Sequence, residues 1–480
     1  MMSTEYMQSL LIAGEWREPV RKGRKEVTNP ATGEVIAVIG HGDSEDALMA
    51  VQAAEGAFPE WSATSVRTRA NILNAAAGLL RQRADHIGHT LASETGKPLA
   101  QARGEVNFAA EYFQWFAEEI RRPHGYCIPS DAANRRHIAY TQPAGVALCL
   151  TPWNFPVSIQ ARKIAPALAA GCTVVARASD EAPLSVLELF RCIADAGVPG
   201  GAANLVLGPA SVTTEAMMKH PAVRVVSFTG STAVGRTLMH RAADGIVRLA
   251  LELGGDAPFI VFDDADVVQA VEGAMIAKFR NNGQSCIAAN RFYVHEEVYD
   301  QFVTLLAEKI AKMKIGNPVG GAQVDLGPLI NLASKARVEG LVHEAEALGG
   351  KHLVPEMEVP AAGYYVAPAI MENVPESAGL AREELFAPVA PVFKFADEAE
   401  VIKKANNTDM GLAAYVYTGA LSCSARVTEA LRFGIIGLNN ALPSVAYAPM
   451  GGVKQSGLGR EGARTGLEEF MDIKYVATDL

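Results

Sequence analysis

Apolar and polar positions alternate along most of the chain in a way that predicts strands followed by helices. From Gly145, short apolar runs such as GVALCLT, CTVVAR, ANLVLG and VRVVSFTG are separated by longer segments with helical periodicity. A second series begins near Pro258 with PFIVF and continues through RFYVH, PVFKF and AAYVYT. This alternation is typical of βαβ units, in which helices cover both faces of a parallel sheet. The pattern therefore predicts an α/β protein with two doubly wound parallel sheets.

The two ends of the chain follow a different pattern. The stretch up to Gly40 predicts short strands and turns, and helical stretches follow at about residues 44–83 and 105–121. The final segment, MDIKYVATDL, predicts a lone strand, which we expect to pair with another domain or another subunit. We therefore predict two α/β units with borders near residues 255 and 455, and an additional β element made of residues 122–143 and the tail.

Composition limits the class of protein. The chain has 480 residues, 49% hydrophobic and 20% charged, as in a soluble globular protein of about three domains. A net charge of −10 without a long basic run argues against a nucleic-acid surface. No apolar stretch approaches the ~20 residues of a membrane span, and no signal peptide is visible. Six cysteines without a CxxC motif favour reduced thiols, so we expect a cytoplasmic protein.

One cysteine differs from the others in its surroundings. Cys286 follows the polar, helix-breaking segment RNNGQS, so we expect it at a strained turn that faces a cleft. A thiol presented by backbone amides in such a turn can become a thiolate nucleophile, and a structural role is the alternative. The remaining cysteines are interpreted as structural residues rather than nucleophiles: Cys127, Cys149, Cys172, Cys192 and Cys423.

One acidic residue stands out at a predicted strand end. Glu252 ends the apolar run LALELGG, so its carboxylate is expected at the carboxyl edge of a sheet, where open α/β sheets bind ligands. The alternative is a lone carboxylate in water. His86 and His89 stand three residues apart without further ligands, so we predict no metal site.

Two further strand ends are candidates for binding phosphate or ribose. VRVVSFTGSTAVGR places Gly230 and Ser231 between a strand and a helix, where free backbone N–H groups point at an anion. CTVVARASDEAPLS ends its strand in Arg177, Ser179 and Asp180 just before another helix. The GxGxxG match GLGREG follows a polar segment rather than a strand, so we do not interpret it as a phosphate site.

Together these segments resemble the aldehyde dehydrogenase superfamily. NPATGEVIA, PWNFP, FTGST, LELGG, GQSC, EELFAPV and GGVKQSGLGREG occur in the family's order over essentially the whole chain. The resemblance implies a homodimer or homotetramer. It also implies a dinucleotide-binding domain at residues 1–121 and 144–254, a catalytic domain at 255–455, and an oligomerisation element at 122–143 and 456–480.

The resemblance implies a covalent mechanism. Cys286 matches the family's nucleophile, and Glu252, 34 residues before it, matches the general base for thioester hydrolysis. The side-chain amide of Asn154 and the backbone N–H of Cys286 match the donors that hold the oxyanion. Losing one such donor typically raises the barrier by about 3 kcal/mol. An enzyme of this kind oxidises an aldehyde to a carboxylic acid with NAD(P) and needs no metal.

The resemblance also assigns residues to the cofactor. Gly230 and Ser231 match residues at the pyrophosphate, and Glu384 matches the glutamate at the nicotinamide ribose. Trp153 and Phe386 match aromatic residues that lie nearby.

The segment at the adenosine ribose departs from the family. Arg177-Ala178-Ser179-Asp180 replaces the usual Lys-Pro-Ser-Glu. Arg177 still donates hydrogen bonds, with a geometry different from that of lysine. Asp180 retains an acid that accepts from ribose hydroxyls and repels a 2′-phosphate, although it is shorter than glutamate. We therefore expect NAD as the cofactor, with NADP as the alternative.

Within the superfamily, the chain most resembles succinate-semialdehyde dehydrogenases. Arg162, Arg280 and Ser444 match the residues that clamp the distal carboxylate of the substrate. For Arg280, a cap at a helix end is the alternative. Pro443 and Met450 depart from the usual neighbours of Ser444, so other acidic aldehydes are alternative substrates: glutarate semialdehyde, phosphonoacetaldehyde and sulfolactaldehyde.

Other functions remain as rivals. A general aldehyde dehydrogenase would use the same machinery without the arginine clamp. A coenzyme-A-acylating relative would lack the hydrolytic glutamate, and a non-catalytic binding protein would lack the nucleophile, whereas Glu252 and Cys286 are both present.

Overall fold

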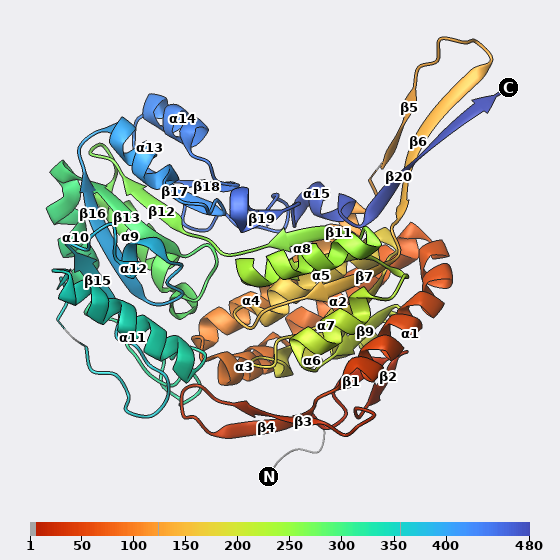
Figure 1. Ribbon diagram of the computed structural model, residues 1–480, viewed down its shortest axis with the longest axis horizontal. Coiled ribbons are helices and arrows are strands. Elements are labelled where there is room, and N and C mark those ends of the chain that lie inside the picture. The colour runs from red at the N-terminus through yellow and green to blue at the C-terminus, as the bar shows by residue number, and fades with distance from the viewer. Residues whose placement is uncertain (1–5, 123, 356) are drawn as a thin grey trace.

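The computed structural model describes residues 6–122, 124–355 and 357–480 (Figure 1). The expectation about a signal peptide rests partly on residues 1–5, which lie outside the described residues. Among the helices of the described chain, none is both long enough and apolar enough to cross a membrane.

The strands are short and lie in separate regions of the chain. They are β1 Leu10–Ile12, β2 Glu15–Arg17, β3 Arg24–Thr28, β4 Val35–Gly40, β5 Gly125–Ile128, β6 Arg135–Pro143, β7 Val146–Leu150, β8 Thr173–Arg177, β9 Ala203–Val206, β10 Val223–Thr229, β11 Arg248–Glu252, β12 Ala257–Val261, β13 Ala289–His295, β14 Lys351–His352, β15 Ala369–Glu372, β16 Val389–Phe395, β17 Ala413–Tyr417, β18 Ile435–Leu438, β19 Gly457–Leu458 and β20 Met471–Asp479.

The helices lie between and around these strands. They are α1 Ser44–Ala63, α2 Val66–Gln82, α3 Ala84–Thr95, α4 Leu99–Glu119, α5 Pro156–Ala170, α6 Leu184–Asp195, α7 Ala210–Met218, α8 Thr232–Gly245, α9 Val267–Phe279, α10 Glu296–Ile310, α11 Leu332–Ala347, α12 Gly379–Arg382, α13 Glu398–Asn406, α14 Leu421–Ala430 and α15 Ala463–Glu468, with short 3-10 helices η2 Arg280–Gly283 and η3 Lys454–Ser456.

In the described chain, the first large sheet has eight strands in the order β19-β11-β10-β7-β8-β9-β1-β2. Its central strands, from β11 to β9, are parallel, and the strands at both edges are antiparallel. The chain order reverses between β7 and β10. Ligands of open α/β sheets bind at the carboxyl edge next to such a reversal. The loops after β7, β8 and β10 therefore flank the predicted ligand position.

The second large sheet has seven strands in the order β14-β15-β16-β13-β12-β17-β18 within the described residues. All its pairings are parallel except that of β14 with β15. Its central strands β12 and β17 are buried along their whole length, as strands covered by helices on both faces must be. The predicted fold, two doubly wound sheets with a small extra β element, is confirmed.

The small extra sheet joins two distant parts of the chain. β20 pairs antiparallel with β6, from Met471 opposite Pro143 to Asp479 opposite Arg135, and β5 pairs with β6 on the other side. Figure 1 shows this sheet projecting as an arm from the body of the molecule. The tail strand thus pairs with a strand of its own chain.

The segment that precedes the tail strand returns to the first sheet. β19 pairs antiparallel with the end of β11 that carries Glu252, so that Gly457 lies opposite Glu252. The helix α15 packs against α5. Residues 457–468 therefore contact the first α/β unit, although we grouped them with the oligomerisation element. The assignment of roles to the domains stays a prediction.

Candidate active site

Cys286 lies in an irregular turn between η2 and β13. Asn281, Asn282 and Gly283 all have positive φ, a conformation that asparagine and glycine adopt more readily than other residues. The Asn282 amide donates to the carbonyls of Gly96 and Pro328 at 3.0 and 2.9 Å. The turn is therefore fixed by side-chain hydrogen bonds rather than by regular secondary structure, as the break in the sequence pattern predicts.

Asn154 follows β7 and lies beside the same turn. Its side-chain nitrogen donates to the carbonyl of Gln284 at 3.2 Å, and its backbone carbonyl accepts from the Asn281 amide at 2.9 Å. One of the two hydrogens on the Asn154 amide nitrogen remains for a ligand. The structure thus brings Asn154 to the loop that carries Cys286.

Glu252 ends β11 and is buried. Its residue is 2% exposed, and neither carboxylate oxygen has a hydrogen-bond partner among the described residues. Burial, followed by the nearby Glu461 carboxylate, raises the pKa of Glu252 above its ordinary value. The alternative of a solvated edge carboxylate is therefore wrong.

A buried ion-pair network lies next to Glu252. Lys163, on α5, forms an ion pair with Glu461 and donates to the Ser227 hydroxyl at 3.2 Å. Arg162, the neighbour of Lys163, lies 3.5 Å from the other oxygen of Glu461. Sequence reasoning missed Lys163 and Glu461. Two adjacent basic residues in the otherwise apolar helix α5, whose residues are all buried, were the available signal.

The surroundings of Cys286 disfavour its thiolate form. Burial raises its pKa, and the Glu252 and Glu384 carboxylates raise it further. The nearby Arg162 guanidinium acts in the opposite direction.

Cys286 lines a cavity of about 390 Å³ together with Glu252 and the three predicted substrate residues Arg162, Arg280 and Ser444. The Arg280 guanidinium lies 5.4 Å from the centre of the Phe155 ring and makes no hydrogen bond or ion pair within the described chain. A guanidinium that only capped a helix would donate to helix carbonyls. This cationic group instead lines the cavity without an ion-pair partner in the described chain.

Two residues that sequence reasoning did not assign also shape this cavity. The sulfur of Met450 lies 2.6 Å from Nη1 of Arg162 and 3.3 Å from the hydroxyl of Ser444. The Arg162 guanidinium also lies over the ring of Tyr112 at 5.2 Å. Met450 therefore occupies the space between two of the three predicted substrate residues.

Cys286 also lines a second cavity, of about 210 Å³. Five of the predicted cofactor residues line it, together with Asn154: Trp153, Gly230, Ser231, Glu384 and Phe386. The rings of Trp153 and Phe386 meet edge to face at 5.7 Å, and the Glu384 carboxylate accepts from the backbone N–H of Gly255 at 3.1 Å.

The second cavity fits the nicotinamide end of a dinucleotide. The buried hydroxyl of Thr229 has no partner among the described residues and lies at the N-terminal side of α8, whose cap is Ser231. A helix N-terminus attracts phosphate. A Cβ at Gly254 would lie 2.9 Å from the Glu384 carboxylate, so a side chain there would crowd the wall of the cavity.

The remaining cofactor candidates lie at the end of a neighbouring strand. Arg177 is the last residue of β8, and its carbonyl accepts from the N–H of Thr151, which follows β7. Ser179 and Asp180 follow Arg177. Asp180 forms an ion pair with Arg177 and a contact with His41. They are not part of the cavity beside Cys286.

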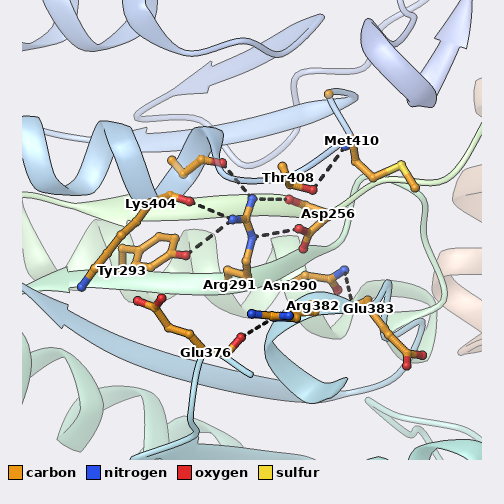
Figure 2. A network of polar contacts seen from close by, with 12 residues as sticks. Asp256, Asn290, Arg291, Tyr293, Glu376, Arg382, Glu383, Lys404, Thr408 and Met410 are labelled. Atoms are coloured by element: carbon orange, nitrogen blue, oxygen red, sulfur yellow. Dashed lines mark hydrogen bonds and ion pairs between the residues drawn. The ribbon is translucent and has the colours of Figure 1, made fainter. Parts of the chain in front are cut away.

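A second polar network surrounds Arg291 (Figure 2). Arg291, on β13, forms a buried ion pair with Asp256 and donates to the backbone carbonyls of Asp256, Lys404 and Ala405. Asp256 lies four residues after Glu252, and Arg291 lies five after Cys286. The ion pair therefore connects the segment that follows Glu252 to the strand that follows Cys286.

Within the described residues, no cluster of three or more histidine, cysteine, aspartate or glutamate side chains is arranged to hold a metal ion. His86 is exposed and contacts Glu188 at 3.7 Å.

Comparison with known proteins places the chain among enzymes. The model of the aldehyde dehydrogenase family matches residues 16–476. The NADP(+)-dependent succinate-semialdehyde dehydrogenase of Escherichia coli is 43% identical over 478 residues, which is 100% of this chain and 99% of that protein. The glutarate-semialdehyde dehydrogenase of Pseudomonas putida is 44% identical over 471 residues, 98% of each chain. The crystal structure of betaine aldehyde dehydrogenase from Staphylococcus aureus in complex with NAD+ matches with a TM-score of 0.95 and 34% identity, covering 99% of this chain and 95% of that chain.

Proposed function

The chain belongs to the aldehyde dehydrogenase family, and we propose that it oxidises succinate semialdehyde to succinate, with Cys286 as the nucleophile. It is an NAD(P)-dependent aldehyde dehydrogenase. One observation carries the proposal: Cys286 lines both cavities, and Arg280 faces the first of them without an anionic partner. The thiol of Cys286 therefore borders both the cavity that would take the aldehyde and the cavity that would take the nicotinamide.

In the first step the thiol of Cys286 loses its proton to solvent, and the thiolate then attacks the aldehyde carbon. A carbon–sulfur bond forms and the carbonyl oxygen becomes an oxyanion. The free hydrogen of the Asn154 amide and the backbone N–H of Cys286 stabilise this oxyanion. When bound, the oxidised nicotinamide ring supplies the hydride acceptor. Loss of the hydride from the same carbon leaves a thioester on Cys286.

The second step is hydrolysis of that thioester. The unpartnered Glu252 carboxylate takes a proton from water, the hydroxide adds to the thioester carbon, and the carbon–sulfur bond breaks. The acid is released and the thiol is restored. A coenzyme-A-acylating enzyme would not need Glu252, so its burial beside the first cavity favours hydrolysis.

Two arginines favour an acidic aldehyde. Arg162 and Arg280 can each bind a carboxylate by paired hydrogen bonds, and Ser444 lies on the same wall. Among the relatives, succinate-semialdehyde and glutarate-semialdehyde dehydrogenases both occur. Glutarate semialdehyde, phosphonoacetaldehyde and sulfolactaldehyde are therefore the alternative substrates, and a neutral aldehyde is the weakest candidate.

The substrate proposal is tested by NADH formation with succinate semialdehyde, phosphonoacetaldehyde and propanal, for wild type and Arg280→Leu. We expect wild type to prefer the acidic aldehydes by about a hundredfold in kcat/KM, which corresponds to about 3 kcal/mol, and Arg280→Leu to lose that preference. Equal activity with propanal, unchanged in Arg280→Leu, would show a general aldehyde dehydrogenase.

For the cofactor, we propose NAD as the preferred form and NADP as the alternative, because Asp180 lies at the end of β8. We further propose that the enzyme is cytoplasmic and forms a homodimer or homotetramer. The arm of β5, β6 and β20 supports oligomerisation, since its exposed apolar side chains lie on both faces of a thin sheet.

A further inference from the structure

The end of β8 carries a cation and an anion that bind each other. Nη2 of Arg177 lies 2.9 Å from Oδ1 of Asp180 and 2.8 Å from the carbonyl of Gly208, and Nε of Arg177 also donates to that carbonyl at 3.3 Å. Its Nη1 has no hydrogen-bond partner in the described part of the chain. One edge of the guanidinium is therefore available to a ligand.

A second basic side chain reaches the same carboxylate from a distant segment. His41 follows β4, and its Nε2 lies 3.2 Å from Oδ2 of Asp180. The loop is fixed there because the N–H of Gly42 donates to the carbonyl of Leu207 at 2.7 Å. The two oxygens of Asp180 thus contact two different basic groups, and all three side chains are partly accessible, at 11–25% exposure.

These groups have opposite preferences for the two cofactors. An acid after the second strand of a dinucleotide-binding unit accepts from the ribose 2′-hydroxyl of NAD, whereas a nearby arginine accommodates the 2′-phosphate of NADP. β8 is the second strand of the parallel series that starts with β7. This chain therefore holds both determinants at one position, with each partly neutralising the other.

We propose that His41 is a cofactor-specificity residue that acts with Arg177 and Asp180 at the 2′ position of the adenosine ribose. In this arrangement, Asp180 is the shared counter-ion that weakens, without abolishing, the binding of a 2′-phosphate by Arg177 and His41. The inference rests on the proposed cofactor site, and it goes beyond it by adding a residue from the β4–α1 loop.

The test compares wild type with Asp180→Asn, His41→Ala and the double variant. Binding of NADH and NADPH is measured by fluorescence titration, which does not depend on turnover. We expect wild type to bind NADH more tightly. We expect Asp180→Asn to bind NADPH at least tenfold more tightly than wild type does, as for one charge-assisted hydrogen bond. In the double variant, at least fivefold of that gain should be lost.

The single His41→Ala variant should change the affinity for NADPH in the opposite direction. Removing a basic group while Asp180 remains should weaken NADPH binding at least threefold and change NADH binding less than twofold. Asp195→Asn, which breaks a surface pair with Arg83 at 2.6 Å, is the matched control and should change neither Kd.

Each outcome decides a separate part of the proposal. If Asp180→Asn gains NADPH affinity and the double variant keeps all of it, His41 has no part in specificity. If Asp180→Asn leaves both affinities unchanged, the cluster is not the 2′ subsite. Oxidation of succinate semialdehyde with NAD by wild type is assayed in parallel, so loss of the proposed function would be seen separately from loss of this inference.

Discussion

Glu252 combines two properties that a general base for thioester hydrolysis needs, proximity to the nucleophile and an unshared carboxylate. It lines the same cavity as Cys286, and neither of its oxygens has a partner in the described chain. The cost of this arrangement is a raised pKa, caused by burial and by the carboxylate of Glu461. Glu252 is therefore protonated more often at neutral pH than a solvated glutamate.

This raised pKa predicts the pH dependence of kcat. The base form of Glu252 increases as the pH rises through its pKa, so kcat limited by hydrolysis should increase from neutral to mildly alkaline pH. The Cys286 thiol, whose pKa is also raised, adds to the same trend in kcat/KM. Stopped-flow measurement of the hydrolysis step checks this. A rate that is flat over this range, or that falls with rising pH, would contradict the assignment of Glu252.

At the residue scale, the sequence predicts what lies in short contiguous motifs. Cys286, Glu252 and Asn154 were singled out from such motifs. Lys163 and Glu461 were not, because their meaning lies in a contact between residues 298 positions apart. His41 was missed for the same reason, since 139 positions separate it from Asp180.

At the scale of elements, the Asp256–Arg291 pair joins the segment between β11 and β12 to the start of β13. Both side chains are almost fully buried, and Figure 2 shows the Arg291 guanidinium enclosed by acceptors. Removing one partner of a buried pair leaves the other charge uncompensated.

Asp256→Asn should therefore lower the stability of the second α/β unit by about 3 kcal/mol. The urea midpoint of unfolding, followed by far-ultraviolet circular dichroism, measures this loss. Asp195→Asn, whose partner Arg83 is at the surface, should lower stability by less than about 1 kcal/mol. Equal shifts in both variants would show that the buried pair has no special role.

The sequence predicts the elements in which apolar residues repeat regularly, but it does not predict the irregular ones. The parallel strands from β7 to β11 follow apolar runs that the sequence displays directly. The return of β19 to β11 is not visible in the sequence, because only two residues pair there. The positive φ of Asn281 and Asn282 has a local signal in the residue type, but their hydrogen-bond partners come from other elements.

At the scale of the whole molecule, the arm exposes apolar surface that a monomer would leave in water. On one face of its sheet lie Tyr126, Ile128, Ile473 and Tyr475, each at least 41% exposed. Contiguous apolar surface of this kind marks a protein interface. The sequence predicted the β element, whereas its projection from the body follows from tertiary packing that no local pattern encodes (Figure 1).

The double substitution Ile473→Asp and Tyr475→Asp should therefore shift the protein to a smaller species. Charges on this face would be desolvated in the assembly and solvated in the free subunit. Light scattering at micromolar concentration measures the mass. Leu421→Asp, at a position 85% exposed on α14, is the control and should leave the mass unchanged. If light scattering shows that wild type is itself a monomer, the prediction is wrong.

We propose above all that the thiol of Cys286, which lines both cavities, forms the thioester, and that Glu252 acts as the base for its hydrolysis. The most direct test is mass spectrometry of Glu252→Gln after incubation with succinate semialdehyde and NAD. We expect a succinyl thioester to accumulate on Cys286, together with one equivalent of NADH. Steady turnover by Glu252→Gln without an adduct, or an adduct on another residue, would contradict it.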